Sequence, residues 1–236
     1  MQTIDPIIQK FLHDNGITEL VGDHRLMRYP TPKPKQNCNI DRVAVFGSAD
    51  IDELDPLFQE VLIVGRSLAR HNKVVIDGGG PGVMDAITKG AQAEGGKVIG
   101  VTFYPQDMPE FEGRYFENEV DLEVKTTSYI QRMFGLIDQA DAFICFKGGT
   151  GTLSEWATAW LLSHLYYGNH KPMILYGSFW HAVMQMIQEN FFIEAKESSI
   201  YKIVENPEEL LVSLQEFERE LFDRCGLPYS TSDISE

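Results

Sequence analysis

The chain has 236 residues, of which 43% are hydrophobic and 23% are charged, and its formal net charge is −15 at pH 7. This length is enough to bury one full α/β core and does not by itself require two domains. The acidic balance argues against nucleic acid as a partner, because a phosphate backbone needs a basic binding face. No run reaches the roughly 18 apolar residues of a membrane span, and residues 1–16 lack the pattern of a signal peptide. We therefore expect no membrane partner and a cytoplasmic location.

Residues 1–40 have a different pattern from the rest of the chain. Ile4–Leu12 is a short amphipathic segment, and residues 30–34 read Pro-Thr-Pro-Lys-Pro, which is typical of a linker. We predict a helical extension with a proline-rich linker at 1–40, a single domain at 41–225 and a polar tail at 226–236. The extension could cover a site, extend a dimer or pack on a sheet edge, and its sequence does not choose among these roles.

Short apolar runs alternate with amphipathic helical segments along the predicted domain. The runs predicted to be strands are Val43–Phe46, Val74–Ile76, Val98–Phe103, Leu122–Val124, Ala142–Phe146, Met173–Tyr176 and Tyr201–Val204. This alternation predicts an α/β fold, with a three-layer, doubly wound, Rossmann-like and mainly parallel sheet that has helices on both faces.

Two of the predicted strands run directly into glycine turns. Gly47 and Ser48 follow the first strand, and residues 78–82 read Gly-Gly-Gly-Pro-Gly between the second strand and a helical segment. The second turn does not have the G-x-G-x-x-G spacing of dinucleotide-binding proteins. Turns at the carboxyl ends of parallel strands meet at one edge of the sheet, so we expect both to line one crevice.

A third glycine turn follows the apolar run that ends at Phe146, and a helical pattern begins after it. Glycines let a backbone approach an anion closely, and the N–H groups and dipole of a helix N-terminus favour negative charge. The sequence therefore predicts a phosphate site here. Its residues are Gly148, Gly149, Thr150, Gly151 and Thr152.

Glu155 lies one helical turn after this predicted phosphate site. Thr152 and Glu155 have the spacing of a capping box, in which each side chain accepts a backbone N–H of the other residue. A carboxylate beside a bound phosphate also costs repulsion, which a loop that only binds phosphate would avoid. Both interpretations, helix capping and catalysis, stay open from spacing alone.

The paired motifs Gly78-Gly79-Gly80 through Met84 and Gly148 through Glu155 resemble those of the Lonely Guy family, over residues 41–215. That family comprises nucleoside 5′-monophosphate phosphoribohydrolases, and its second motif is P-G-G-x-G-T-x-x-E. Arg132 falls where the family carries an essential arginine. The family is also called lysine decarboxylase-like, but Lys171 is better explained by the polar start of the strand that follows it, so we do not expect a decarboxylase.

The resemblance implies hydrolysis of the N-glycosidic bond of a purine nucleoside 5′-monophosphate, AMP or a cytokinin-type nucleotide, to free base and ribose 5-phosphate. Glu155 would stabilise positive charge that develops on the ribose, or orient or deprotonate the attacking water. Arg132 would hold the ribose phosphate, or keep Glu155 ionised and aimed. The other turns would contribute further substrate-binding residues, namely Gly47, Ser48, Gly79, Gly80 and Met84.

Two positions within this region differ from the family pattern. Lys147 replaces the proline before the glycines, and Met133 stands where many members have a basic residue. Both are expected to alter the mouth of the site. They would favour an alternative function as a nucleotide or molybdenum-cofactor carrier, and a purely structural oligomer is a further alternative.

The cysteines and histidines show no metal-binding or redox spacing, so we expect no metal and no cofactor. Cys145 lies within a predicted strand and is interpreted as a core residue. A homodimer is expected from the family resemblance. Large apolar residues at 156–167 and around Met133 are compatible with an interface, and equally with burial inside one subunit.

Overall fold

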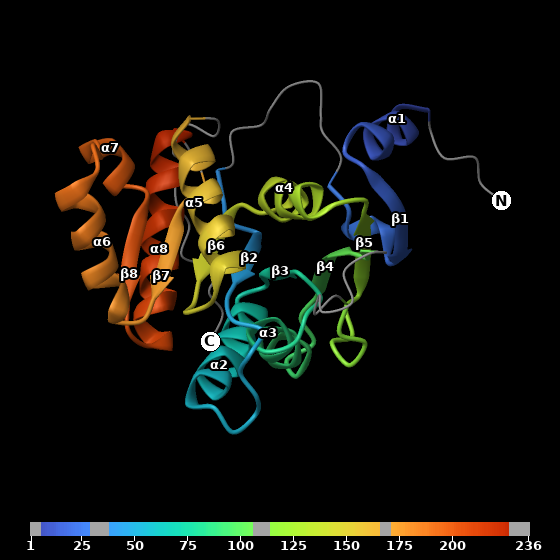
Figure 1. Ribbon diagram of the computed structural model, residues 1–236, viewed down its shortest axis with the longest axis horizontal. Coiled ribbons are helices and arrows are strands. Elements are labelled where there is room, and N and C mark those ends of the chain that lie inside the picture. Colours follow the sequence, from blue (N-terminus) through green and yellow to red (C-terminus); the bar gives the residue numbers. More distant parts are fainter. Residues whose placement is uncertain (1–5, 29–37, 106–113, 166–170, 227–236) are drawn as a thin grey trace.

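Within residues 6–28, 38–105, 114–165 and 171–226, which the computed structural model describes, eight strands form one sheet in the order β1-β5-β4-β3-β2-β6-β7-β8 (Figure 1). All neighbouring pairs are parallel except β1 and β5. The strands are β1 (Ile17–Gly22), β2 (Arg42–Phe46), β3 (Val74–Asp77), β4 (Val98–Phe103), β5 (Leu122–Thr126), β6 (Ala142–Cys145), β7 (Met173–Tyr176) and β8 (Tyr201–Val204). The predicted fold class and all seven predicted strands are confirmed, with strand ends that differ by at most two residues.

Helices cover both faces of the sheet. Side chains of α2, α3 and α8 pack in one hydrophobic core, and those of α4, α5 and α6 pack in a second core on the other face. The helices are α1 (Pro6–Asp14), α2 (Pro56–Arg70), α3 (Val83–Gln92), α4 (Tyr129–Gln139), α5 (Thr150–Leu165), α6 (Phe179–Asn190), α7 (Ala195–Ser198) and α8 (Pro207–Arg224), with a short 3-10 helix at His24–Leu26. No helix in the described ranges is both long and apolar enough to cross a bilayer.

The chain order places the site at the centre of the sheet. From β2 the sheet grows one way through β3 and β4, and the other way through β6 and β7. The connections that leave β2 and β6 therefore diverge, and a crevice forms at the carboxyl ends of these two neighbouring strands. The glycine turns predicted to bind the ligand all follow β2, β3 or β6, so the fold brings them to this crevice.

The described part of the N-terminal extension packs on the sheet edge, which was one of the three roles considered. Its strand β1 pairs antiparallel with β5 from Ile17 to Gly22, and Phe11 of α1 packs against the second core. Sequence analysis did not predict β1. Its side chains are mostly exposed or half-buried, so the strand lacks the apolar run that marked the others. The predicted linker at 30–34 and residues 227–236 of the predicted tail lie outside the described residues.

An ion pair between half-exposed Arg28 and buried Asp141 ties the end of this extension to the domain. Both guanidinium Nη atoms of Arg28 donate to the Asp141 carboxylate, which is 1% exposed and also accepts the backbone N–H groups of Asp41 and Arg42. The Gln139 side chain accepts the Arg28 N–H and donates to the Arg28 carbonyl. A buried carboxylate with several donors is well compensated. Residues 26–28 are thereby fixed beside the amino ends of β2 and β6, opposite the crevice.

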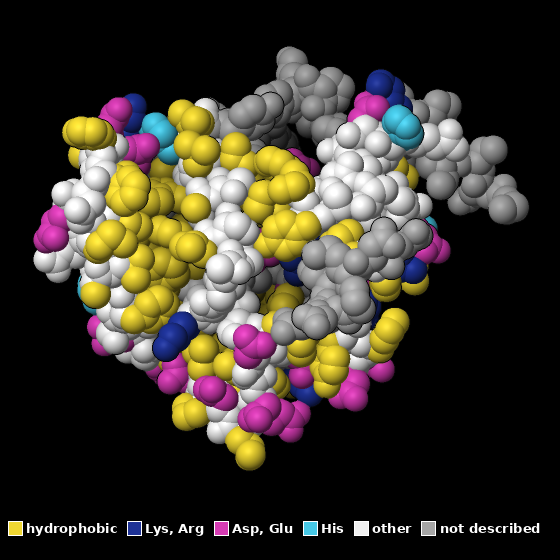
Figure 2. Space-filling view, viewed as in Figure 1, with side chains coloured by type: hydrophobic (Ala, Val, Ile, Leu, Met, Phe, Trp, Pro, Cys, Tyr) yellow, Lys and Arg dark blue, Asp and Glu magenta, His cyan; other side chains and the backbone are white. Residues whose placement is uncertain are grey.

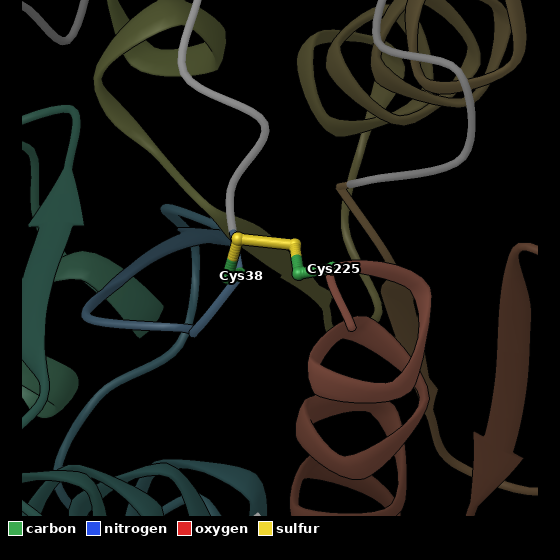
Figure 3. Close-up of a disulfide and its surroundings, with 2 residues drawn as sticks. All are labelled: Cys38 and Cys225. Carbon is green, nitrogen blue, oxygen red and sulfur yellow. A yellow bond between two sulfur atoms is a disulfide. The ribbon is translucent and has the colours of Figure 1, made fainter. Parts of the chain in front are cut away.

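A disulfide joins Cys38, just before β2, to Cys225 at the end of α8 (Figure 3). The two cysteines are 187 residues apart in the sequence, and their Cα atoms are 5.8 Å apart. This pair was not predicted, because the spacing of two cysteines that are far apart in the sequence carries no information about their pairing. Cys145 is a free, fully buried thiol, which confirms its interpretation as a core residue.

Candidate functional site

A cavity of about 340 Å³ opens at the carboxyl ends of β2, β3 and β6. This volume lies within the usual range for small-ligand sites. Its lining includes ten of the twelve predicted site residues: Gly47, Ser48, Gly80, Met84, Arg132, Gly149, Thr150, Gly151, Thr152 and Glu155. The remaining lining residues, Ala49, Asp50, Pro81 and Tyr129, were not predicted. Residues from all three glycine turns therefore line one cavity, and the crevice predicted from the sequence is present.

Backbone hydrogen bonds hold the three turns together. The Ser48 N–H donates to the Lys147 carbonyl at 3.0 Å, and the Ser48 carbonyl accepts the Val83 N–H at 2.9 Å. A Cβ at Gly148 would overlap Oγ1 of Thr152, so only glycine fits there. Gly148 does not line the cavity. Its role is to let the Thr152 side chain lie close to the backbone of the turn.

The N-terminus of α5 faces the cavity. The helix begins at Thr150, and the Leu153 N–H already donates to the Gly149 carbonyl at 3.0 Å. The first N–H groups of a helix have no partner within it and carry partial positive charge, so this end suits an anion. Because the helix begins at Thr150 and Thr152 lies inside it, the capping-box interpretation of Thr152 and Glu155 is wrong.

The Glu155 side chain instead pairs with Arg132 from α4. Nη1 of Arg132 donates to Oε1 of Glu155 at 3.0 Å, and the exposed fractions of the two side chains are 11% and 9%. Burial raises the pKa of Glu155 above its ordinary value, and the Arg132 charge and hydrogen bond oppose that rise. The pair therefore places a partly desolvated carboxylate one helical turn from the N-terminus of α5.

The other nitrogens of Arg132 are also engaged. Nε donates to the Val101 carbonyl at 3.1 Å, and Nη2 donates to the Gly78 carbonyl at 3.3 Å. Nη2 also lies 3.7 Å from Sδ of Met84. The guanidinium is therefore held on several sides, which fixes the direction from which it meets Glu155.

Tyr129 forms part of the wall between α4 and α5. Its hydroxyl lies 3.0 Å from Oγ of Ser154, and its ring lies beneath the Arg132 guanidinium at 5.9 Å from centroid to carbon. Tyr129 was not predicted as a site residue, although its spacing from Arg132 was a usable signal. Tyr129 and Arg132 are three residues apart in a helix that Ser128 caps, so they share one face.

Gly79 was predicted to bind substrate, but it does not line the cavity. Its N–H donates to the Asp77 carboxylate at 2.6 Å, and its carbonyl accepts the Tyr115 N–H at 2.9 Å. The second glycine turn is therefore tied to its own surroundings, and only Gly80 and Pro81 of it reach the cavity.

Neither departure from the family pattern lines the cavity. Met133 is 6% exposed and packs in the second core, because it lies on the face of α4 turned toward the sheet. Lys147 is exposed, and its backbone carbonyl ties the turns together. The expectation that Met133 alters the mouth of the site is therefore wrong.

The described residues contain no group of histidines, cysteines or carboxylates that could hold a metal ion. The contacts of Lys171 give it a structural role. Its ammonium group donates to the carbonyls of Ile137 and Asp138 at the end of α4, and burial lowers its pKa to about 8.

Comparisons with known proteins support the family resemblance. A family model described as the SLOG cluster4 family matches residues 41–211. A Mycobacterium tuberculosis protein named cytokinin riboside 5′-monophosphate phosphoribohydrolase is 31% identical over 135 residues, which cover 56% of this chain and 68% of that protein. Relatives named phosphoribohydrolases at about this identity support a phosphoribohydrolase-type activity at the level of the family.

Two solved structures have the same fold. The structural-genomics target TM1055 is 25% identical, with a TM-score of 0.57, and the match covers 75% of this chain and 99% of that one. A molybdenum cofactor binding protein from Rippkaea orientalis is 21% identical, with a TM-score of 0.54, and the match covers 75% and 97% of the two chains. At 21% identity the second likeness shows the fold alone. The family match spans all three glycine turns, Arg132 and Glu155, and the chain therefore belongs to the SLOG cluster4 family of Lonely Guy-like proteins.

Proposed function

We propose that this protein hydrolyses the N-glycosidic bond of a purine nucleoside 5′-monophosphate, AMP or a cytokinin-type nucleotide, to free base and ribose 5-phosphate. The observation that carries the proposal is the buried pair of Arg132 and Glu155 beside the N-terminus of α5. An anion site and a desolvated carboxylate in one cavity suit a substrate that has a phosphate at one end and develops positive charge nearby.

In this proposal the 5′-phosphate lies on the N–H groups at the start of α5. The ribose then lies over Glu155, whose carboxylate stabilises the oxocarbenium character of the transition state. Water adds to C1′ while the bond from C1′ to the base nitrogen breaks, and the base leaves with that electron pair and gains a proton. Glu155 accepts or orients the proton of the attacking water, and Arg132 keeps the carboxylate ionised and aimed.

The carrier function is the alternative, and the fold alone does not separate it from hydrolysis. The features that favoured it were Lys147 and Met133, and neither lines the cavity. A carrier would retain its ligand without forming a product, so the two functions differ in a measurable way.

The test is incubation of the purified protein with a panel of nucleotides: AMP, GMP, IMP, an N6-prenylated AMP, and CMP and UMP as pyrimidine controls. Free base and ribose 5-phosphate are both quantified. Release from a purine nucleotide by the natural protein, and loss of release in Glu155→Gln, would support hydrolysis. Tight binding of a nucleotide in calorimetry without any product would overturn it in favour of the carrier.

A homodimer is proposed on separate grounds. Helix α5 buries Trp156 and Trp160 against the sheet, yet Leu153, Leu161 and Leu165 on its outer side are more than half exposed. A helix with apolar side chains on two opposite sides is normally buried by other protein surface on both of those sides. Figure 2 shows hydrophobic side chains gathered over α4, α5 and α6 on this face of the molecule. A second copy of the chain would cover them.

A further inference from the structure

Asp77, at the end of β3, is a buried carboxylate that the proposed reaction does not use. Its side chain is 0% exposed and does not line the cavity. Oδ1 accepts the Gly79 N–H at 2.6 Å, and Oδ2 accepts the Thr88 hydroxyl at 2.7 Å. Burying a carboxylate is costly unless it is hydrogen-bonded, and these two donors offset the cost. The contact with Gly79 makes Asp77 the anchor of the second glycine turn.

Asn118 anchors the same turn from the other side. Its Nδ2 donates to the Gly80 carbonyl at 2.9 Å and lies 3.5 Å from Oδ1 of Asp77. Asn118 is 0% exposed although it lies outside every helix and strand of the sheet region. Asp77 and Asn118 together therefore fix the backbone between Gly78 and Gly80.

This turn holds Arg132. The Gly78 carbonyl accepts Nη2 of Arg132 at 3.3 Å, and a Cβ at Gly78 would overlap that same atom. The guanidinium therefore rests directly on the turn, while its Nη1 points to Glu155. A shift of the Gly78 carbonyl would change the direction of the whole planar group.

We propose that Asp77 is a positioning residue, which with Asn118 fixes the Gly78 carbonyl and so aims the Arg132 guanidinium at Glu155. The expected effect of Asp77 on catalysis rests on the proposed function, whereas its effect on the position of Arg132 does not. The inference is based on a continuous series of contacts. Asp77 accepts the Gly79 N–H, Gly79 is bonded to Gly78, and the Gly78 carbonyl accepts Nη2 of Arg132.

Charge contributes to the same coupling. The groups that face Asp77 are Arg132 from α4 and Arg114 from the segment before β5, and Arg114 in turn lies 3.4 Å from Glu123. Burial raises the pKa of Asp77 to about 6, and the hydrogen bonds from Thr88 and Gly79 oppose the rise, as do the charges of both arginines. Protonation of Asp77 therefore removes a negative charge beside Arg132 within an accessible pH range.

The kinetic test compares Asp77→Ala and Asp77→Asn in the hydrolysis of the best nucleotide substrate. Asp77→Ala frees the turn, and misplacement of a catalytic group by about 1 Å costs on the order of 10²-fold in rate, so kcat should fall by that order with little change in KM. Asp77→Asn keeps an acceptor for Gly79 and should recover most of kcat. Equal, natural-like kcat in both variants would overturn the inference.

A second readout does not depend on activity. The Nε–H group of Arg132 donates to a buried carbonyl, so its signal in ¹⁵N-arginine-labelled protein reports the guanidinium position and can be assigned with Arg132→Lys. In Glu155→Gln protein, which lacks the other nearby carboxylate, this signal should shift with a midpoint near pH 6. The shift should vanish when Asp77→Asn is added.

The control is Asp141→Asn, which neutralises a buried carboxylate at the opposite end of the sheet and should leave both the kinetics and the Arg132 signal unchanged. If the signal keeps its titration in the Asp77→Asn protein, Asp77 does not act on Arg132. If the titration is lost as expected but no variant or natural protein releases base, the coupling stands and the proposed hydrolysis is what fails.

Discussion

Arg132 and Glu155 come from different helices, 23 residues apart, and their side chains meet at 3.0 Å with about a tenth of each surface exposed. Salt bridges on protein surfaces have little energetic effect, whereas removing one member of a buried pair leaves a desolvated charge behind. This pair lines the cavity rather than packing in either hydrophobic core. Its desolvated charges are therefore available to a ligand that enters.

Replacing Glu155 by glutamine should preserve the fold and nucleotide binding but lower kcat. The amide is nearly isosteric and can still accept from Arg132, but it carries no charge to stabilise a cationic transition state. Removal of a comparable electrostatic group costs about 10²–10³-fold in rate. Steady-state hydrolysis and calorimetric titration measure the two effects, with Glu189→Gln on the exposed face of α6 as a matched control. Near-natural turnover by Glu155→Gln would remove Glu155 from the mechanism.

The pH dependence of hydrolysis should follow the ionisation of Glu155. Burial raises its pKa, so the reactive carboxylate is lost at a higher pH than for an exposed glutamate. The ratio kcat/KM should therefore fall as the pH decreases through this raised pKa. Arg132→Ala should raise the pKa of Glu155 further, because Arg132 favours the ionised form, and ¹³C NMR of the Glu155 carboxyl can follow it. A pKa of Glu155 that stays unchanged in Arg132→Ala would contradict this account.

Asp77 should make the fold less stable as the pH rises. Its pKa is about 6 in the folded protein against 3.8 for the ordinary group, so the folded state holds the proton more tightly than the unfolded state. Its contribution to stability is fully present below pH 3.8 and is lost as the pH rises through 6, by about 3 kcal/mol at 1.36 kcal/mol per pKa unit. Asp77→Asn should lack this dependence. Urea unfolding of both proteins between pH 4.5 and 7.5 measures the difference, and parallel curves would refute the prediction.

An aspartate at Leu161 should abolish the proposed homodimer. The residue is 52% exposed on the outer side of α5, and a charge there would be buried without a partner if a second copy covers this helix. Multi-angle light scattering should report a dimer for the natural protein and a monomer for Leu161→Asp. Val212→Asp on α8, which packs on the opposite face, is the matched control because Val212 is 54% exposed. A monomeric natural protein would rule out the dimer.

The features that were predicted correctly are those whose sequence pattern lies within one short stretch of the chain. Each central strand is an apolar run buried on both faces, and the glycine turns and Arg132 lie within short motifs. Asn118 had no such signal, because its partners, Asp77 and Gly80, lie 41 and 38 residues away in the sequence. The inward direction of Met133 depends on which face of α4 packs on the sheet, and the motif around it does not give that face. The capping box that the spacing of Thr152 and Glu155 left open does not form, because α5 starts two residues before Thr152.

The disulfide between Cys38 and Cys225 should stabilise the oxidised protein. A crosslink restricts the unfolded chain, and for a loop of this length the chain-entropy model gives at most about 5 kcal/mol. Thermal unfolding with and without reductant measures the effect, and Cys225→Ser should be insensitive to reductant. Disulfides are uncommon in cytosolic proteins, so the expected cytoplasmic location calls for alkylation of the thiols directly in cells. Equal melting temperatures in both redox states would show that the bond is not formed.

The same bond turns most of the chain into a covalent ring. The ring runs from residue 38 to residue 225 and encloses the whole stretch that matches the family, residues 41–211, while α1 and β1 remain outside it as a tail. One cut of the backbone anywhere inside the ring leaves the two pieces covalently joined. One cut between β1 and residue 38 instead makes the tail a separate peptide, which only noncovalent contacts hold to the rest. On a non-reducing gel, a protein nicked once inside this ring would therefore keep its full mass, and only reductant would reveal the break.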